Sequence, residues 1–528
     1  MRRTIAASLL AMVTVSAGLT SQTATAQAGH AGTPSDQASE VAASQVADAL
    51  GLATNDRASA TKTGIERQDY SLKLASMFAG YDQLAAAGKR NADAALGRPT
   101  QGASDPYNDG YSVHEATPIC GSHVCLHYVK STTDAPPLTD DNADGIPDWV
   151  RHNLDVMESV WGYEVNKLGY RAPAKDTNAP HHGPDGRFDV YLANLGDQGL
   201  YGYCAPEWRV GSQKNRASGF CVLDNDFSTA EFGAPPNNSL RVTAAHEFFH
   251  AIQFNYDYNE DHWIMEVSST WMEERYADDV NDNRQYIAYG QEKKPGIPLD
   301  VFQSSGLAQY GNWVFFERLT KKYGFGAVKN IWSRLDGTNG KPNNYSIQGV
   351  KNYLKSKGMA FPKFYAWFGA GNIFPKTFYS EGAATAYQPG APIAKAWRFT
   401  SSKRYLSWQK TTLQHLSNRN FAFLTDATLT GAWHLKIKVN GPGLASGTAA
   451  QVIVVSKAGK LTPKIVKLNS KGDGTIIVNF SGGTIAGVSL TLANGSTRFN
   501  CNKGTAYSCH GTPLDNNRNF SFSAVAAR

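Results

Sequence analysis

Two histidines and a glutamate stand at a spacing that suits metal chemistry. His246, Glu247 and His250 form the pattern HExxH within residues 243–254. On a helix, residues four apart share a face, so both imidazoles can reach one metal ion while Glu247 lies beside it. Ala and Phe neighbours would pack such a helix into a core, and a surface helix with two ordinary histidines is the alternative. The pattern predicts a zinc site in which Glu247 accepts a proton.

A catalytic zinc ion needs a third protein ligand as well as an open position. Glu266 follows His250 by 16 residues, which leaves room for a loop and a returning helix. Its neighbours are apolar, and a buried carboxylate needs a partner such as a metal. We expect Glu266 to be this ligand, with Asp257, Asp261 and Glu273 as alternatives. Glu273 lies seven residues further on the same helix face and could orient a ligand.

Residues 246–250 followed by residues 263–273 resemble the gluzincin metalloproteases, in which a second helix supplies a glutamate as third zinc ligand. More closely, the chain is similar to secreted bacterial zinc metalloproteases over about residues 106–285. The resemblance implies a gluzincin-like fold, a protein or peptide substrate, and an edge strand that binds the substrate backbone; residues 219–223 stand in that place. The chain departs from the group at Val267, where Gly or Ala is usual, in a shorter spacing between the ligands, and in lacking a GxMEN stretch.

The resemblance also implies a mechanism. The zinc ion would polarise the scissile carbonyl and acidify water, and Glu247 would take a proton from that water and pass it to the leaving amine. Aminopeptidase-like gluzincins stabilise the oxyanion with a downstream tyrosine. Tyr310 has a similar placement; His262 and a purely structural tyrosine are the alternatives. Gln253 and Tyr256 stand where metzincins carry Gly and then His or Asp, which excludes that class.

Residues 140–148 follow the start of an EF-hand-type calcium loop. The oxygen ligands would come from the side chains of four residues and one carbonyl: Asp140, Asn142, Asp144, Ile146 (carbonyl) and Asp148. Position twelve holds Arg151 in place of the usual bidentate glutamate. We expect Ca²⁺ as a second metal; an Asp- and Asn-rich turn that caps the next helix is the alternative.

The N-terminus predicts export. Arg2 and Arg3 precede an apolar stretch at residues 5–19, and two A-x-A patterns follow by position 28, so residues 1–28 are expected to be a signal peptide. No later apolar run approaches the roughly 18 residues of a membrane span. Six cysteines agree with an extracellular location. Although 15 connectivities exist, proximity favours three local pairs: Cys120 with Cys125, Cys204 with Cys221, and Cys501 with Cys509.

Charge is divided unevenly along the chain. The net charge is +6, but residues 391–528 hold 17 Lys and Arg against three acids, or +14, so the remainder carries 6 − 14 = −8. An acidic body suits bound cations, whereas a basic region is attracted to anionic polymers such as those of a cell surface. Improved solubility is the alternative explanation. We expect no nucleic acid partner.

At 528 residues the chain is too long for one core, and its aromatic content excludes a disordered body. We expect a helical prosegment or linker at residues 29–105, with helices at 39–52 and 63–96. A metalloprotease domain of α+β class should follow at 106–390, with strands preceding helices. Alternating residues then predict a basic β-sandwich at 391–528. The expected strands and helices of the last two regions are 124–129, 149–168, 188–192, 219–223, 240–254, 263–276, 313–323, 328–335, 433–439, 451–455, 475–480 and 488–492.

Together these features predict a secreted, zinc-dependent endopeptidase. Two alternatives stay open: an extracellular binding protein with an inactive protease-like body, and a zinc hydrolase of non-peptide bonds. The intact Glu247 argues against the first, because an inactive body has no need of a base. Assays of peptides beside other substrates would separate the second.

Overall fold

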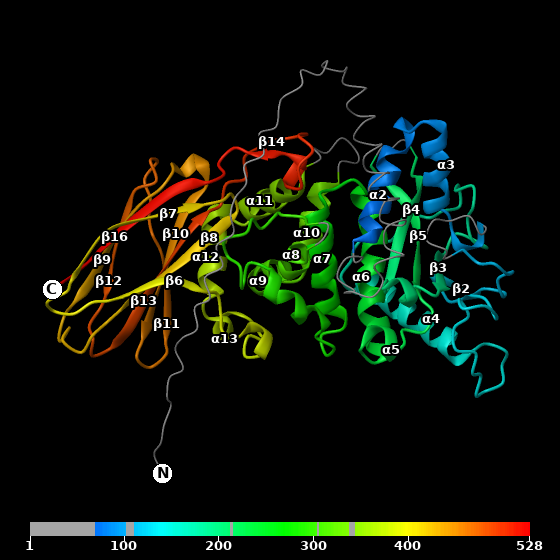
Figure 1. Ribbon diagram of the computed structural model, residues 1–528, viewed down its shortest axis with the longest axis horizontal. Helices are drawn as coiled ribbons and strands as arrows, with labels where there is room; N and C mark the ends of the chain where they lie inside the picture. Colours follow the sequence, from blue (N-terminus) through cyan, green and yellow to red (C-terminus); the bar gives the residue numbers. More distant parts are fainter. Residues whose placement is uncertain (1–68, 102–109, 212–214, 304–305, 337–343) are drawn as a thin grey trace, which may run out of the picture.

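The computed structural model describes residues 69–101, 110–211, 215–303, 306–336 and 344–528 (Figure 1). The expected signal peptide and the helix at 39–52 lie outside these residues. A mixed sheet with helices occupies one end of the described molecule, a helical region its middle, and a β-rich region the other end. The α+β class is therefore confirmed. Among the described residues, no helix combines the length and the apolar character that a membrane crossing requires.

The first sheet has the order β1-β2-β3-β5-β4. β2, β3 and β5 are parallel, whereas β1 and β4 are antiparallel to their neighbours. β2 and β5 are buried along their whole length, as expected for parallel strands covered on both faces. The bounds of the five strands are β1 (Ile119–Cys120), β2 (Val124–His127), β3 (Phe188–Ala193), β4 (Gly202–Arg209) and β5 (Ala217–Asp224).

The prediction that residues 219–223 form the edge strand is wrong. They belong to β5, which lies between β3 and β4, and β4 is the edge strand. A run of eight residues buried on both faces suits an interior strand. β4 contains Pro206, which cannot donate a backbone hydrogen bond and is tolerated at an edge beside a bulge.

Helices cover both faces of this sheet. On one face lie α4 (Asp148–Trp161), which continues as one π-helical turn (Gly162–Lys167), and then α6 (Pro236–Asp257) and α7 (His262–Tyr276). α2 (Tyr70–Gly80) and α3 (Ala86–Ala95) lie at the β4 edge, joined by a 3₁₀ turn. The predicted helix at 63–96 is therefore broken where Leu84 and Ala85 separate α2 from α3.

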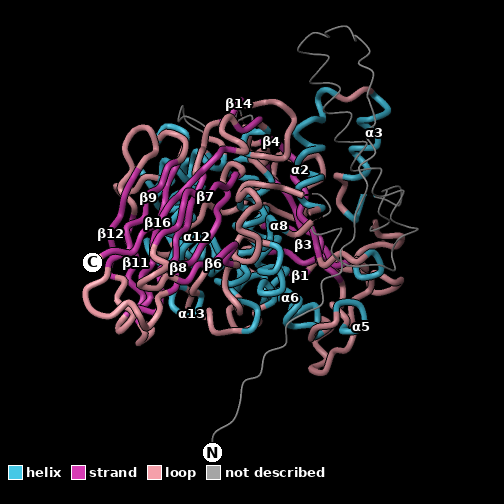
Figure 2. Tube along the Cα trace, turned by 60° about the vertical axis from the view of Figure 1, so that its left-hand side comes forward, coloured by secondary structure: helices cyan, strands magenta, loops and turns pink. Residues whose placement is uncertain are grey.

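The middle of the molecule is helical and contains the helices predicted at 313–323 and 328–335. Its helices are α8 (Ala308–Gly311), α9 (Trp313–Tyr323), α10 (Gly326–Leu335), α11 (Ser346–Ser356), α12 (Phe361–Gly371) and α13 (Pro375–Phe378), while the short α5 (Thr229–Phe232) precedes α6. α12 packs against β8, β10 and β13 of the β-rich region. This helix thus connects the helical middle with the β-rich region (Figure 2).

The β-rich region has two sheets, with orders β11-β10-β13-β8-β6 and β12-β9-β16-β7. β9 alternates strictly between exposed and buried residues. One apolar core includes residues from both sheets, among them Phe423, Ile437 and Phe522. The strands are β6 (Ile393–Arg398), β7 (Tyr405–Leu413), β8 (Ser417–Leu424), β9 (His434–Asn440), β10 (Thr448–Ser456), β11 (Leu461–Ile465), β12 (Gly474–Asn479), β13 (Ile485–Asn494), β16 (Arg518–Ala527) and the small pair β14 (Phe499–Asn500) and β15 (Thr512–Pro513).

All three predicted disulfides are present. The loop closed by Cys501 and Cys509 returns to the helical region, where the backbone N–H of Cys509 donates to Asp261 Oδ2 at 2.7 Å. Asp261 is the residue that precedes α7. The C-terminal region therefore contacts the start of the helix that carries Glu266.

Candidate active site

The two helices that carry the predicted metal ligands are held in the interior. α6 begins at Pro236, a favoured first helical residue, and is buried from Val242 to Asp257 without interruption. α7 is buried from Trp263 to Glu274. α6 packs against α7, α4 and strands β4 and β5. Its buried stretch therefore presents no face to solvent, and its histidines are not ordinary surface residues.

His246, His250 and Glu266 meet at one point. One ligand atom from each lies within 4.8 Å of the others. His246 Nε2 is 3.2 Å from Glu266 Oε2, and His250 Nε2 is 3.8 Å from Glu266 Oε1. Ligands about 2.1 Å from a tetrahedral zinc ion lie about 3.4 Å apart. The two observed separations lie on either side of this value, so the group could hold one metal ion.

The outer nitrogens of both imidazoles have acceptors. His246 Nδ1 is 2.6 Å from Glu273 Oε1, and His250 Nδ1 is 2.8 Å from Gln253 Oε1. The Gln253 amide donates to the Met265 carbonyl on α7 at 3.0 Å, which fixes the orientation of its oxygen. A proton on each Nδ1 leaves both Nε2 atoms free to bind a metal, and such outer partners orient metal-binding histidines.

The three residues fit a cation because, without one, two of their buried polar atoms lack a partner among the described residues. His250 Nε2 and Glu266 Oε1 are buried and have no hydrogen-bond partner among the described residues. Burial raises the pKa of Glu266 and of Glu273 to about 7. Burial also holds the pKa of His250 well below its usual value, which favours the neutral imidazole that a metal needs. Burial acts the same way on His246, but hydrogen bonds to Glu266 and Glu273 raise the pKa of that ring. A zinc ion would satisfy the two unpartnered atoms and stabilise the carboxylates.

Glu247 lies next to these ligands and contacts α2. Its Oε2 accepts a hydrogen bond of 2.8 Å from the Ser71 hydroxyl, and the residue is 6% exposed. Burial raises the pKa of its carboxyl group, although His246 and Ser71 act in the opposite direction. A carboxylate of raised pKa next to a metal site is suited to accept a proton near neutral pH.

Tyr310 lies beside the ligands, as predicted. Its ring stacks 6.2 Å from that of His246, and its hydroxyl is buried without a hydrogen-bond partner in the described part of the chain. A cavity of about 50 Å³ adjoins Tyr310, His246 and Glu247. The alternative residue, His262, lies 2.9 Å from the Ser76 hydroxyl of α2. Tyr310 is thus the better placed of the two to reach a group bound at the metal.

The remaining alternatives for the third ligand are engaged elsewhere. Asp257 accepts a hydrogen bond from Asn215 at 3.0 Å. Asp261 accepts from the Ser346 hydroxyl and from the backbone of Cys509. Only Glu266 among the carboxylates considered shares a metal-sized group with both histidines in the described residues.

The predicted calcium loop is exposed and folds as a turn. The Asp140 carboxylate accepts from the backbone N–H groups of Asp144 and Gly145 at 3.2 and 2.8 Å. Arg151 forms an ion pair with Asp144. The loop is not among the described groups whose three or more acidic, His or Cys donors converge. Calcium binding there stays a prediction.

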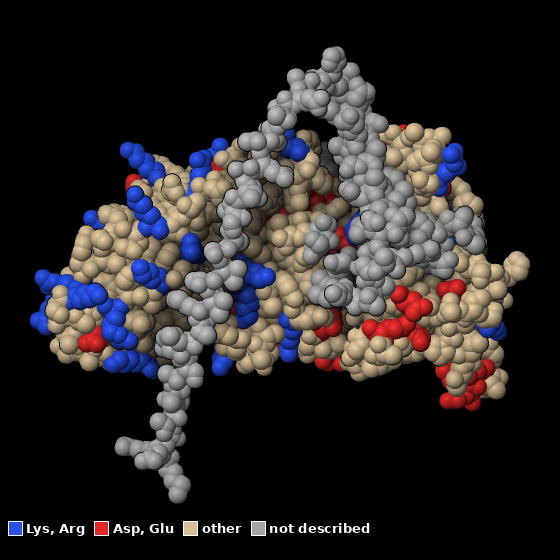
Figure 3. All heavy atoms as spheres, in the orientation of Figure 1, with Lys and Arg blue, Asp and Glu red and all other residues tan. Residues whose placement is uncertain are grey.

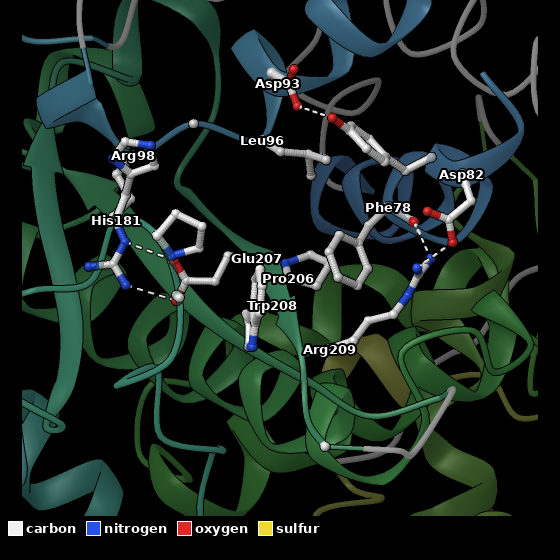
Figure 4. A pocket seen from close by; sticks show the side chains of 15 residues that line it. Phe78, Asp82, Asp93, Leu96, Arg98, His181, Pro206, Glu207, Trp208 and Arg209 are labelled. Carbon is white, nitrogen blue, oxygen red and sulfur yellow. Dashed lines mark hydrogen bonds and ion pairs between the residues drawn. The ribbon is translucent and has the colours of Figure 1, made fainter. Parts of the chain in front are cut away.

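A buried charge cluster, which the sequence did not indicate, ties the segment that carries α2 and α3 to the sheet. Figure 4 shows one part of it, the pair of Arg98 and Glu207. Arg98 donates to Asp176 at 2.8 Å, to Asp189 at 2.6 Å, and to Glu207 at 2.8 and 2.9 Å. His127 is 2.9 Å from the other oxygen of Asp189. The Arg98 side chain is 3% exposed. Its partners are 78 to 109 residues away in the chain, so no local pattern could have revealed them.

Comparison with protein-family models and with curated proteins gives no match. Two solved structures are similar in part. The pre-peptidase C-terminal domain of a collagenase from Bacillus anthracis is 8% identical, with 26% of this chain and 97% of that domain covered and a TM-score of 0.15. A family GH115 4-O-methyl-α-glucuronidase with specificity for decorated arabinogalactans is 6% identical, with 55% of this chain and 38% of that chain covered and a TM-score of 0.14. At TM-scores this low, neither similarity defines a shared fold or function.

Proposed function

We propose that the chain is a secreted zinc-dependent endopeptidase of the gluzincin type. One observation carries the proposal: ligand atoms of His246, His250 and Glu266 converge within 4.8 Å, as a bound metal ion would need, and Glu247 is adjacent. The three disulfides are compatible with an extracellular protein. The resemblance of residues 246–273 to gluzincins supplies the reaction class.

Each residue would have a distinct task. His246, His250 and Glu266 would hold the zinc ion, which supplies Lewis acidity and acidifies water when bound. Glu247 would accept the proton of the attacking water and pass it to the amine that leaves. Tyr310 would donate its hydroxyl proton in a hydrogen bond to the oxygen that gains charge. Glu273 and Gln253 would orient the two imidazoles.

The test compares wild type with Glu247→Gln, with zinc content measured in both. Hydrolysis of casein and of a non-peptide ester panel is followed before and after brief trypsin treatment, which is stopped with trypsin inhibitor. The proposal predicts that wild type cleaves casein and that Glu247→Gln holds equal zinc without cleaving. Ester hydrolysis alone would favour a zinc hydrolase of other bonds. Zinc binding without any hydrolysis would favour a binding protein.

We further propose that residues 140–148 hold calcium. The ligands would be Asp140, Asn142, Asp144 and Asp148 with the Ile146 carbonyl. Ca²⁺ binding would have to displace Arg151 from Asp144, so a weak site is expected. Calcium should raise the unfolding temperature of chelator-treated wild type and leave that of Asp140→Ala unchanged.

The β-rich region also supports a proposal about an anionic polymer. Basic residues gather over this region in Figure 3, and acidic residues gather at the opposite end. The outer face of the sheet β12-β9-β16-β7 carries a row of paired residues, Ile477, Lys436, Val525 and Tyr405, that crosses all four strands. Ile477 and Tyr405 are among the most exposed large apolar side chains described, at 57% and 66%. A cationic face with exposed apolar groups suits an anionic cell-surface polymer.

A further inference from the structure

Helix α2 takes the place that a substrate would need. The backbone N–H of Cys204, on the edge strand β4, donates to Ser71 Oγ at 2.9 Å. The same hydroxyl donates to Glu247 Oε2 at 2.8 Å. One serine of α2 therefore engages both the free edge of the sheet and the proposed general base.

The contacts of α2 extend over both sides of the β4 edge. Tyr70, Leu74 and Met77 belong to a core that includes Tyr203, Ala205 and Phe220 on one side of the sheet. Leu72, Ala75 and Phe78 belong to the core around α6 on the other side. An extended peptide binds a sheet by adding a strand to its free edge. At Tyr203–Ala205, α2 excludes such a strand.

The space left beside the site is too small for a peptide. The cavity that adjoins His246, Glu247 and Tyr310 has a volume of about 50 Å³, room for a few water molecules, whereas ligand pockets measure about 300–1,000 Å³. His246 is 8% and Glu247 6% exposed. Asp69, which precedes α2, is buried as well. In the intact chain the site is therefore closed.

Beyond α2 the segment forms an arch over the second half of β4. The arch consists of the 3₁₀ turn (Tyr81–Gln83) and α3, most of whose residues are partly or fully exposed. It spans a cavity of about 760 Å³ that is also lined by Pro206, Trp208 and Arg209 of β4 (Figure 4). After the arch, Arg98 enters the buried cluster with Asp176, Asp189 and Glu207. The segment is thus anchored at two places. The arch between them also adds Leu84, Ala92 and Ala95 to a core, but its residues 86–91 are exposed or half-buried.

We infer that α2 is a built-in inhibitor of the site and that the removable part of the chain ends within the arch, before Arg98. The inference rests on the proposed function, whose regulation it describes. A removable prosegment would then end before Arg98 rather than at residue 105, because loss of Arg98 would leave three buried carboxylates without its guanidinium. While α2 stays linked, its effective concentration at the cleft is on the order of millimolar. After a cut in the arch, α2 can dissociate from the cleft.

The test places a cut in the arch of the full chain. Residues 86–91 are replaced by the recognition sequence of a site-specific protease. A matched control carries the same sequence in place of residues 401–403, an exposed turn of the β-rich region. Each protein is made with Glu247 and with Glu247→Gln, and zinc is measured in all four. Casein hydrolysis is recorded in the Glu247 forms, and hydrogen exchange of the β4 amides in the Glu247→Gln forms, before and after cutting.

The arch cut should raise casein hydrolysis at micromolar protein by about 10²-fold or more, and the control cut should not. It should also speed exchange of the Cys204 amide, which Ser71 no longer protects. Equal hydrolysis before and after the cut, or unchanged exchange of β4, would overturn the inference while leaving the proposed function intact. Faster exchange with zinc bound and no hydrolysis would support the inhibitory docking of α2 and contradict the proposed function.

Discussion

Replacement of Arg98 by methionine removes the only guanidinium of the buried cluster and preserves most of the side-chain volume. The Arg98 side chain is 3% exposed, and those of Asp176, Asp189 and Glu207 are 5%, 0% and 9% exposed. Removal of one partner from a buried ion pair costs about 3–5 kcal/mol, because it leaves the other charge uncompensated. His127 remains beside Asp189, but its two ring nitrogens contact Glu115 and Asp189 rather than Asp176 or Glu207.

The matched control is Arg241→Met. Arg241 forms a two-fold hydrogen-bonded pair with Asp279, but the side chains are 24% and 72% exposed. Such an exposed pair contributes little to stability. Both changes remove an arginine that forms more than one hydrogen bond. The difference between the two variants in stability therefore reports the effect of burial.

Calorimetry of thermal unfolding measures the difference in stability between the two variants directly. Because the molecule has more than one region, the midpoint of the same transition is compared across variants rather than a single free energy. At about 2–3 °C per kcal/mol, Arg98→Met should lower that midpoint by roughly 6–15 °C, and Arg241→Met by no more than about 3 °C. Measurements in the Glu247→Gln background prevent self-digestion.

Arg98→Lys keeps the positive charge but loses the planar guanidinium group that donates several hydrogen bonds. Its unfolding midpoint should therefore lie between those of wild type and Arg98→Met. This variant also provides a measurement if Arg98→Met fails to fold. A midpoint for Arg98→Met within about 2 °C of the surface control would refute the reasoning. It would show that the cluster carries little stability and that Arg98 can be lost with the rest of the segment.

Three further predictions concern separate parts of the molecule. Tyr310→Phe should lower kcat for peptide cleavage by about 10²-fold without loss of zinc, measured on the arch-cut enzyme; a change below twofold would leave Tyr310 as a structural residue. The double change Lys436→Glu and Lys438→Glu should weaken retention on an anionic resin and reduce the salt dependence of that retention. The double change Lys464→Glu and Lys467→Glu should have a smaller effect. Equal effects would show that retention depends on total charge rather than on this face. Burial by itself would lower the pKa of His127, but hydrogen bonds to Asp189 and Glu115 raise it. The protonated ring therefore stabilises the fold below pH about 6.5, and this stabilisation is lost as pH rises through the folded-state pKa. The difference in unfolding temperature between wild type and His127→Gln should shrink from pH 6 to pH 9, and a constant difference would contradict this assignment.

The sequence could predict those parts of the site that depend on local geometry. The four-residue spacing of His246 and His250 fixes a shared helix face wherever the helix packs. Glu266 stood out because an acid among apolar residues needs a partner. The disulfides followed from short separations along the chain. These features hold whatever the tertiary arrangement is.

Long-range relations could not be predicted in the same way. Ser71 and Glu247 are 176 residues apart, and neither the serine nor its neighbours indicates a contact with the base. β4 escaped prediction because Pro206 and Glu207 interrupt its apolar residues, as is permitted only at an edge. Without β4, the next strand was assigned to the edge. β5 is completely buried because other elements cover both faces of the sheet, and this arrangement is visible only in the assembled structure.

The occupancy and coordination of zinc test the central claim most directly. The Glu247→Gln protein, purified without added metal and then equilibrated with a small excess of Zn²⁺, is suited to elemental analysis and zinc K-edge absorption because it cannot digest itself. We predict one zinc ion per chain with two imidazole nitrogens and oxygen completing a four-coordinate shell at about 2.0–2.1 Å. The double variant with His250→Ala should not retain it. Absence of zinc, or a shell of six oxygens that survives His250→Ala, would contradict the account.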